Sequence, residues 1–178
     1  MKILLTGSSG YIGKRLLPVL IENGHYVICC VRDIKRFSVP ESLKSRIQVI
    51  QIDLLDNDSL ANIPKEIDGA FYLVHSMSSS SDYHIQEQKS AENFRNAMAQ
   101  TSVRHVVYLS GIVNETTLSK HLLSRKNVEL ELSKGHYQFT TLRAGIIIGS
   151  GSASFEIMRD LVEKLPVMVA PRWLNTRC

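Results

Sequence analysis

Six short apolar runs, separated by segments with helical spacing, constrain the fold of this chain more than any other feature of its sequence. The runs are KILLT at 2–6, YVICCV at 26–31, QVIQI at 48–52, AFYLV at 70–74, HVVYLS at 105–110 and FTTLRA at 139–144. Runs that are apolar throughout are typical of strands covered on both faces. Because strands that alternate with helices are joined by right-handed crossovers, the pattern predicts a parallel sheet between helical layers.

The segments between and after these runs predict helices with defined ends. A helix over residues 11–23 ends at Gly24 in a left-handed cap, and its buried stripe consists of Ile12, Leu16, Val19 and Leu20. Pro18 should remove one backbone hydrogen bond and kink this helix. A longer helix over 82–100, capped by Asp82, buries Ala91, Phe94, Ala97 and Met98, and a later one over 155–165 stops at Pro166.

Length and composition predict one globular domain. The chain has 178 residues, 44% of them apolar, which is enough for one core and short for two, so we expect one domain over residues 1–178. A net charge of +4 without a long basic run does not favour nucleic-acid binding, whereas a phosphorylated small molecule suits a mildly basic protein. Cys29 and Cys30 read as buried reduced thiols, with no disulfide framework and no metal site. With neither a signal peptide nor a membrane-spanning run in the sequence, we expect a cytoplasmic protein.

A glycine-rich loop, TGSSGYIG at 6–13, joins the first predicted strand to the first predicted helix. In a phosphate-binding loop of this kind, Gly7 permits the turn off the strand, Gly10 lets backbone amides approach a pyrophosphate, and Gly13 lets the helix pack against the sheet. The helix N-terminus then faces the phosphates. The alternative is a glycine-rich turn without a ligand. The candidate cofactor contacts in this loop are Gly7, Ser9, Gly10, Tyr11, Ile12 and Gly13.

Five motifs follow one another along the chain: TGSSGYIG at 6–13, VR after the second strand, IDLLD at 52–56, YLSG at 108–111 and LRAGIIIG at 142–149. In these motifs the chain, from Met1 to about Trp173, resembles the short-chain dehydrogenase/reductase superfamily. Within that superfamily it is most similar to the extended and atypical branches, which include NmrA-like NAD(P)-binding proteins and nucleoside-diphosphate-sugar epimerases. The resemblance implies an α/β fold of the Rossmann type, a three-layer α/β/α arrangement with a doubly wound parallel sheet in the order 3-2-1-4-5-6. A short seventh strand is expected near 167–170.

Arg32, at the end of the second strand, favours NADP as the cofactor, because a cation there accommodates the 2′-phosphate. Asp33 is one residue late for the carboxylate that binds the ribose of NAD, so a small register shift would favour NAD instead. A merely solvated loop is the other alternative. The resemblance adds cofactor contacts from the third and fourth strands, namely Asp53, Leu54, His75 and Ser76, although a histidine at a strand end is often structural.

The resemblance also places a catalytic serine, tyrosine and lysine near the fifth strand, and Ser110 matches the serine. The tyrosine is missing, and His121 and Arg125 are the only pair with the spacing of the Tyr-x-x-x-Lys motif. Tyr108 precedes the serine and Tyr137 follows the helix, so neither is a simple replacement. In one interpretation His121 is an acid-base group and Arg125 binds the nicotinamide ribose. In the other, SKHLLSRK at 119–126 is the solvated face of a helix, and the side chains packed inward are Leu122, Leu123, Val128 and Leu132.

The last part of the resemblance concerns the substrate. It implies that Arg143 and Ala144 border the substrate pocket, although Arg143 could equally form a structural ion pair. Family members usually continue beyond this length, so the substrate-binding region is expected to be truncated here. The leading hypothesis is an NADP-dependent oxidoreductase or epimerase-like enzyme acting on an unidentified small carbonyl or alcohol, with a homodimer as one possible assembly. The competing hypothesis is a non-catalytic NAD(P)-binding redox sensor, regulator or assembly factor.

Overall fold

The structure is a computed structural model that describes residues 1–75, 82–112, 120–165 and 167, with the side chains of residues 120 and 121 excepted. The chain divides into two compact units, Met1–Ala144 and Gly145–Cys178. One NAD(P)-binding domain over residues 1–178 stays a prediction.

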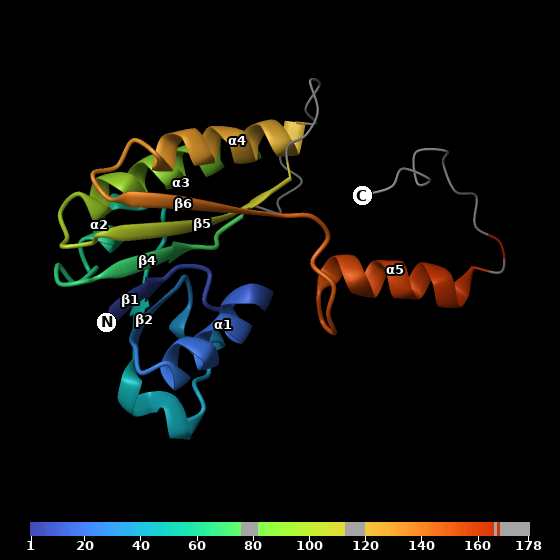
Figure 1. The fold of residues 1–178 in the computed structure, drawn as a ribbon, viewed down its shortest axis with the longest axis horizontal. Helices are drawn as coiled ribbons and strands as arrows, with labels where there is room; N and C mark the ends of the chain where they lie inside the picture. Colours follow the sequence, from blue (N-terminus) through green and yellow to red (C-terminus); the bar gives the residue numbers. More distant parts are fainter. Residues whose placement is uncertain (76–81, 113–119, 166, 168–178) are drawn as a thin grey trace. The chain divides into compact units, whose positions relative to one another are not determined.

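The first unit is built on a six-stranded parallel sheet in the order β3-β2-β1-β4-β5-β6 (Figure 1). Its strands are β1 (Lys2–Leu5), β2 (Tyr26–Val31), β3 (Ile47–Gln51), β4 (Gly69–Tyr72), β5 (His105–Gly111) and β6 (Gln138–Ala144). This topology confirms the predicted doubly wound Rossmann fold and its strand order. The predicted seventh strand near 167–170 falls, except for residue 167, outside the described residues.

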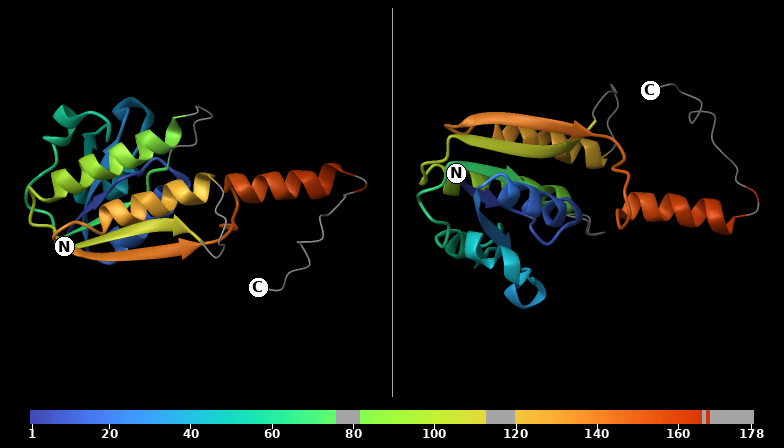
Figure 2. Two further views of the ribbon diagram at one scale, coloured as in Figure 1. Left: turned by 90° about the horizontal axis from the view of Figure 1, so that it is seen from above. Right: turned by 60° about the horizontal axis from the view of Figure 1, so that its bottom comes forward.

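Helices cover the two faces of this sheet, as expected for a three-layer arrangement (Figures 1 and 2). On one face α3 (Tyr83–Met98) and α4 (Lys120–Leu132) lie side by side, and their apolar side chains share a core with β4 and β5. On the other face α1 (Tyr11–Glu22) packs on β1 and β2 in a separate apolar cluster. The remaining short helices are η1 (Ile34–Arg36), η2 (Glu41–Arg46) and α2 (Asn57–Leu60).

The buried stripe predicted for α1 is wrong by one position. Val19 is 49% exposed, and the buried positions of the helix are Gly13, Leu17, Leu20 and Ile21. The reason is that Gly13 packs its bare backbone against the glycine loop, which fixes the rotation of the helix. The helix continues through Pro18 to Glu22, and Gly24 follows it with φ of 81° as predicted. In α4 Leu123 is likewise 48% exposed, whereas Val128 and Leu132 are buried as expected.

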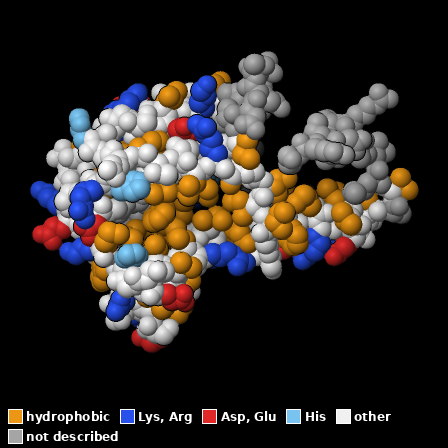
Figure 3. Space-filling view, viewed as in Figure 1, with side chains coloured by type: hydrophobic (Ala, Val, Ile, Leu, Met, Phe, Trp, Pro, Cys, Tyr) orange, Lys and Arg blue, Asp and Glu red, His pale blue; other side chains and the backbone are white. Residues whose placement is uncertain are grey.

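The edge strand β6 departs from the expectation of a strand covered on both faces. None of its residues is fully buried, and Leu142 is 53% exposed. Because β6 pairs only with β5 among the described strands, it lacks the second neighbour that buries the central strands. Figure 3 shows apolar side chains gathered across the middle of the same face of the first unit that Figure 1 displays, with most charged groups toward its margin.

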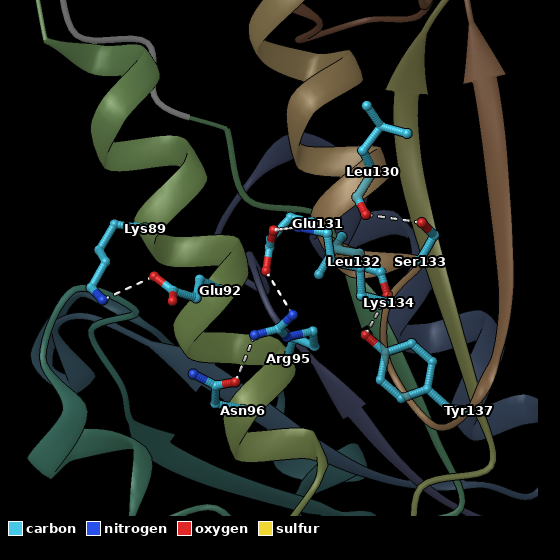
Figure 4. Close-up of polar contacts among 10 residues, drawn as sticks. All are labelled: Lys89, Glu92, Arg95, Asn96, Leu130, Glu131, Leu132, Ser133, Lys134 and Tyr137. Carbon is cyan, nitrogen blue, oxygen red and sulfur yellow. Dashed lines mark hydrogen bonds and ion pairs between the residues drawn. The ribbon is translucent and has the colours of Figure 1, made fainter.

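A buried carboxylate joins α3 to α4 (Figure 4). Glu131, with 8% of its side chain exposed, lies 2.9 Å from the Arg95 guanidinium of α3. It also pairs with Lys134, and Tyr137 donates a hydrogen bond of 2.8 Å to the Leu132 carbonyl at the end of α4. These contacts hold the C-terminal end of α4 against α3 and against the chain that leads into β6.

The second unit contains α5 (Ala153–Lys164), which confirms the helix predicted over 155–165 apart from its bounds. Ser152 precedes the helix and donates a 2.6 Å hydrogen bond to the Ile147 carbonyl, and Glu156 accepts one of 2.8 Å from the Gly151 amide. Gly151 has a φ of 82°, which favours glycine. In the part of the chain that the structure describes, no helix is long and apolar enough to cross a membrane.

Candidate functional site

The glycine loop leaves β1 in the middle of the sheet, between β2 and β4, where the strand order reverses. Thr6 anchors it: its hydroxyl donates a 3.0 Å hydrogen bond to the Phe71 carbonyl and accepts one of 3.2 Å from the Leu73 amide. Ser8, which is fully buried, donates to the Leu5 carbonyl at 2.6 Å. Hydroxyls on both sides of Gly7 therefore fix the loop to β1 and β4.

The absence of side chains at Gly7 and Gly13 lets three backbone segments meet. Gly7 has a φ of 68°, and a Cβ there would lie 2.8 Å from the Leu73 carbonyl oxygen. A Cβ on Gly13 would lie only 2.3 Å from the Gly7 carbonyl oxygen, inside any permitted contact. The turn off β1 and the close approach of α1 are the two features that the sequence pattern assigns to these glycines.

A cleft of about 520 Å³ opens at the carboxyl ends of the central strands. Seven of the predicted cofactor residues line it, namely Gly7, Ser9, Gly10, Arg32, Asp53, Leu54 and His75. Further lining residues that sequence reasoning missed are Tyr72, Gln86, Glu87, Ser90 and Val128. The positions 86, 87 and 90 lie within about one turn of α3, which forms one wall of the cleft, but spacing alone does not distinguish this turn from the other turns of the helix.

Other predicted site residues lie away from this cleft or outside the described part of the chain. Tyr11 and Ile12 belong to the first turn of α1 and do not line the cleft, and the guanidinium of Arg15 lies 4.6 Å from the centre of the Tyr11 ring. Ser76 and the side chain of His121 are outside the described residues, although His121 belongs to α4.

The two charged residues after β2 have different environments. Asp33 turns its carboxylate to its own loop, where it accepts a 2.9 Å hydrogen bond from the Lys35 amide and lies 3.4 Å from Nε of Arg36. Arg32 is exposed and lines the cleft, whereas Asp33 does not. The side of the cleft next to β2 therefore carries a positive charge, and the neighbouring negative charge is engaged locally.

The loop after β3 is held by hydrogen bonds from two helices. The Ser59 hydroxyl of α2 accepts from the Asp53 amide at 2.9 Å and donates to the Asp53 carbonyl at 2.8 Å. The buried Asn93 of α3 donates to the Leu54 carbonyl at 2.8 Å. These contacts present the pair Asp53 and Leu54 to the cleft as a fixed segment.

His75, which lines the cleft, contacts Arg125 of α4, a predicted cofactor residue that does not line it. The Nη1 atom of Arg125 lies 3.2 Å from Nε2 of His75, which joins the segment after β4 to α4. Burial, and secondarily the positive charge of Arg125, lower the pKa of His75 to about 4, although its contact with the Leu109 carbonyl opposes this. The ring is therefore neutral near pH 7.

Tyr108 and Ser110 lie on the α4-facing side of β5. Both are buried, and burial raises the pKa of Tyr108 to about 12 against the opposing effects of Ser110 and Arg125. The interaction of the Ser110 hydroxyl with Tyr108 is weak, because that hydroxyl has no partner at hydrogen-bond geometry among the described residues. A phenol this deeply buried is not poised to exchange a proton with a substrate, in agreement with the sequence argument.

Two further contacts join α4 to its neighbours α3 and β6. Glu87 of α3, which lines the cleft, accepts a short hydrogen bond from the buried Ser124 hydroxyl. Arg143 of β6 lies 2.7 Å from a carboxylate oxygen of Glu129, and this contact raises the pKa of Arg143. Of the two interpretations left open for Arg143, the ion pair is the one that the geometry favours.

Residues 7–153 match a family model described as NAD(P)H-binding. The chain belongs to this NAD(P)H-binding family. Cinnamoyl-CoA reductase 1 of Petunia hybrida is 30% identical over 116 residues, which is 62% of this chain and 35% of the relative. The chain thus spans about a third of the length of this curated relative.

Solved structures share the fold of this NAD(P)H-binding chain. A nucleoside-diphosphate-sugar epimerase from Staphylococcus aureus superposes with a TM-score of 0.67 at 21% identity, covering 80% of this chain and 50% of that one. The triphenylmethane reductase of Citrobacter sp., complexed with NADP(H), gives 0.65 at 17% identity, covering 79% and 48%. The family match confirms the NAD(P)-binding part of the predicted resemblance, and these neighbours show that the chain shares their fold.

Metal ions and reactive cysteines are the other candidate chemical groups of this NAD(P)H-binding chain. Within residues 1–75, 82–112, 120–165 and 167, no cluster of three or more His, Cys, Asp or Glu could hold a metal ion. Cys29 and Cys30 are buried free thiols, and burial raises the pKa of Cys29 to about 11. Such thiols are poor nucleophiles at neutral pH.

Proposed function

We propose that this chain binds NADP and forms the cofactor-binding part of an oxidoreductase or epimerase-like enzyme that acts on a small carbonyl or alcohol. The cleft at the carboxyl edge of the sheet, bordered by the glycine loop up to Gly10, the N-cap of α1, supports dinucleotide binding. Backbone amides of this loop and the positive end of α1 are suited to a pyrophosphate. The pair Asp53 and Leu54 would flank the adenosine.

One observation carries the preference for NADP over NAD. Arg32 is exposed and lines the cleft, while the carboxylate of Asp33 is occupied by the Lys35 amide and Arg36. A carboxylate engaged in its own loop is a poor ligand for ribose hydroxyls, whereas an exposed guanidinium is suited to bind a 2′-phosphate.

The residues that would meet the nicotinamide half are His75, which lines the cleft, and Ser110 and Arg125, which do not line it in this structure. Arg125 can donate hydrogen bonds to ribose hydroxyls but does not release a proton. In the leading proposal His121 exchanges the proton with the substrate oxygen, and the bound cofactor supplies or accepts the hydride. Ser76 is a further proposed cofactor contact.

Calorimetric titration with NADP⁺, NADPH, NAD⁺ and NADH tests the cofactor proposal. We expect the NADP forms to bind more tightly, and Arg32→Ala to weaken them by about tenfold to a hundredfold, since a charge-assisted hydrogen bond contributes roughly 1.5–3 kcal/mol. Lys35→Ala, which removes a neighbouring exposed cation outside the cleft, should leave the affinities unchanged. Absence of binding for all four nucleotides at millimolar concentration would exclude the proposal.

The second candidate function is a non-catalytic NAD(P) sensor, regulator or assembly factor. It is favoured by the lack of any tyrosine between positions 111 and 134 and by the buried state of Tyr108. Turnover of bound cofactor with a panel of carbonyls, in the wild type and in His121→Ala, separates the two functions. An enzyme should lose about a hundredfold or more in rate in the variant. Cofactor binding without turnover of any carbonyl would favour the sensor.

The location of the protein in the cell and its oligomeric state belong to the same proposal. A cytoplasmic location and a homodimer stay predictions. Measuring the molar mass of the protein by light scattering, with and without NADPH, tests the dimer.

A further inference from the structure

The orientation of the His75 ring follows from the chemistry of its partner. A guanidinium has only donors, so Nε2 of His75, 3.2 Å from Nη1 of Arg125, must accept this hydrogen bond. The neutral ring then carries its proton on Nδ1, and its contact with the Leu109 carbonyl stabilises that tautomer. His75 therefore links β5 on one side to α4 on the other.

Arg125 is held at its backbone as well. The Tyr108 hydroxyl of β5 donates to the Arg125 carbonyl at 3.4 Å, a long hydrogen bond that ties this turn of α4 to the sheet. The aliphatic part of the side chain passes the bare backbone of Gly111, because a Cβ at Gly111 would lie 3.5 Å from Cδ of Arg125. A long and otherwise flexible side chain is thus fixed at its backbone, its middle and its guanidinium.

Because the acceptor at position 75 is a neutral imidazole, it holds the Arg125 guanidinium without cancelling its positive charge. Aspartate or glutamate would hold the guanidinium equally well but would cancel its charge. A neutral imidazole leaves the full positive charge of Arg125 available, together with the donors that His75 does not use. His75 lines the cleft and Arg125 does not, so this charge reaches the space proposed for the cofactor at the distance of one side chain, through the 3.2 Å contact with His75.

We propose that His75 is a positioning residue, which accepts a hydrogen bond from Arg125 and so holds that guanidinium, still fully charged, toward the nicotinamide half of the cofactor. This inference rests on the proposed function, in which Arg125 contacts the nicotinamide ribose. It differs from the direct cofactor contact that the family resemblance implies for His75, because His75 acts here through Arg125.

A double-mutant cycle on NADPH affinity, measured by fluorescence titration, tests the inference. His75→Phe keeps a ring but removes the acceptor, and we expect it to weaken NADPH binding about tenfold. His75→Gln places an amide oxygen near the former Nε2 and should restore most of this loss. In the Arg125→Ala background, which is itself weakened, His75→Phe should have no further effect. His105→Phe, the same change at the amino end of β5, should leave affinity unchanged.

The outcomes separate this inference from the function on which it rests. If wild-type protein does not bind NADPH, the proposed function fails and the inference fails with it. If wild type binds NADPH but Arg125→Ala binds equally well, or the two mutational effects add, the function stands and the inference is overturned.

Nitrogen NMR of the histidine rings gives a second readout that does not depend on how well the His75 variants fold. In wild-type protein we expect the His75 signal of a neutral ring protonated at Nδ1. In Arg125→Ala, Nε2 should lose the shift that reflects its hydrogen bond. A wild-type ring protonated at Nε2 would overturn the inference.

Discussion

At the scale of single residues, Gly13 makes the most demanding contact of the site. Its Cα lies so close to the glycine loop that a Cβ would reach 2.3 Å from the Gly7 carbonyl oxygen and 2.8 Å from the Ser8 Cα. Both neighbours are backbone atoms, which cannot move aside as a flexible side chain can. Any larger residue must push α1 away from β1.

Gly13→Ala should therefore lower the free energy of unfolding by about 1–3 kcal/mol, the range found when well-packed regions are overfilled. Urea denaturation followed by circular dichroism measures this. Gly69→Ala provides the matched control, because its Cβ would sit at an ordinary 3.6 Å from the His105 carbonyl oxygen. Equal destabilisation in the two variants would contradict the contact at Gly13.

The sequence could predict site residues that follow strand ends, but it could not predict which side chains within a helix or strand border the cleft. Arg32, Asp53 and His75 follow three different strands, and the carboxyl ends of parallel strands meet at one edge, so they had to approach the same cleft. Glu87 and Tyr72 escaped prediction, because whether a polar helix position or an aromatic strand position borders the cleft depends on tertiary packing.

At the scale of elements, the contact between α3 and α4 depends on the buried carboxylate of Glu131, which pairs with Arg95 and Lys134. Only 8% of the Glu131 side chain is exposed, so its charge would destabilise the folded protein if the cationic partners were removed. The contact matters for the site because α4 carries Arg125 and α3 carries Glu87.

Glu131→Gln should reduce the free energy of unfolding by about 1–3 kcal/mol, because it leaves the Arg95 guanidinium without its charged partner. The control Glu92→Gln removes a carboxylate that pairs with Lys89 at 3.0 Å with 42% of its side chain exposed, and it should leave stability unchanged. Urea titration at pH 7 measures the free energy of unfolding of both variants. A Glu131→Gln protein as stable as wild type would show that the pair is not required.

The existence and type of the long helices could be predicted from periodicity, but their rotation could not. In α1 the packing of Gly13 decides which side faces the sheet, and the buried stripe moves from Val19 to Leu17 and Ile21. A pattern of apolar residues around a helix leaves an uncertainty of about one position, and only contacts distant in sequence remove it.

At the scale of the whole molecule, the cleft gathers segments from distant parts of the first unit at one edge of the sheet. The strand order was predictable because right-handed crossovers and the family resemblance leave few arrangements. The exposure of β6 could not be predicted, because the run FTTLRA resembles the central strands in composition although none of the residues of β6 is fully buried.

NADPH should protect one edge of the sheet from hydrogen exchange and leave the other unaffected. Exchange followed by mass spectrometry should slow in residues 6–10, 52–55 and 72–75, which border the cleft. Residues 23–25 and 102–104, at the amino ends of β2 and β5, serve as internal controls. Protection centred on those control segments would place the cofactor elsewhere.

The central position of β1 has a consequence for synthesis on the ribosome. β1 is made first, yet it needs β4 as a neighbour, and the hydrogen bond from the Lys2 amide to Asp68 joins residues 66 apart in sequence. At about 5–20 residues per second, β1 waits roughly 3–13 seconds with one edge unpaired. During that interval the Thr6 hydroxyl lacks both Phe71 and Leu73, so the nascent chain passes through a state in which β1 and β2 can pair before the loop between β1 and α1 is anchored.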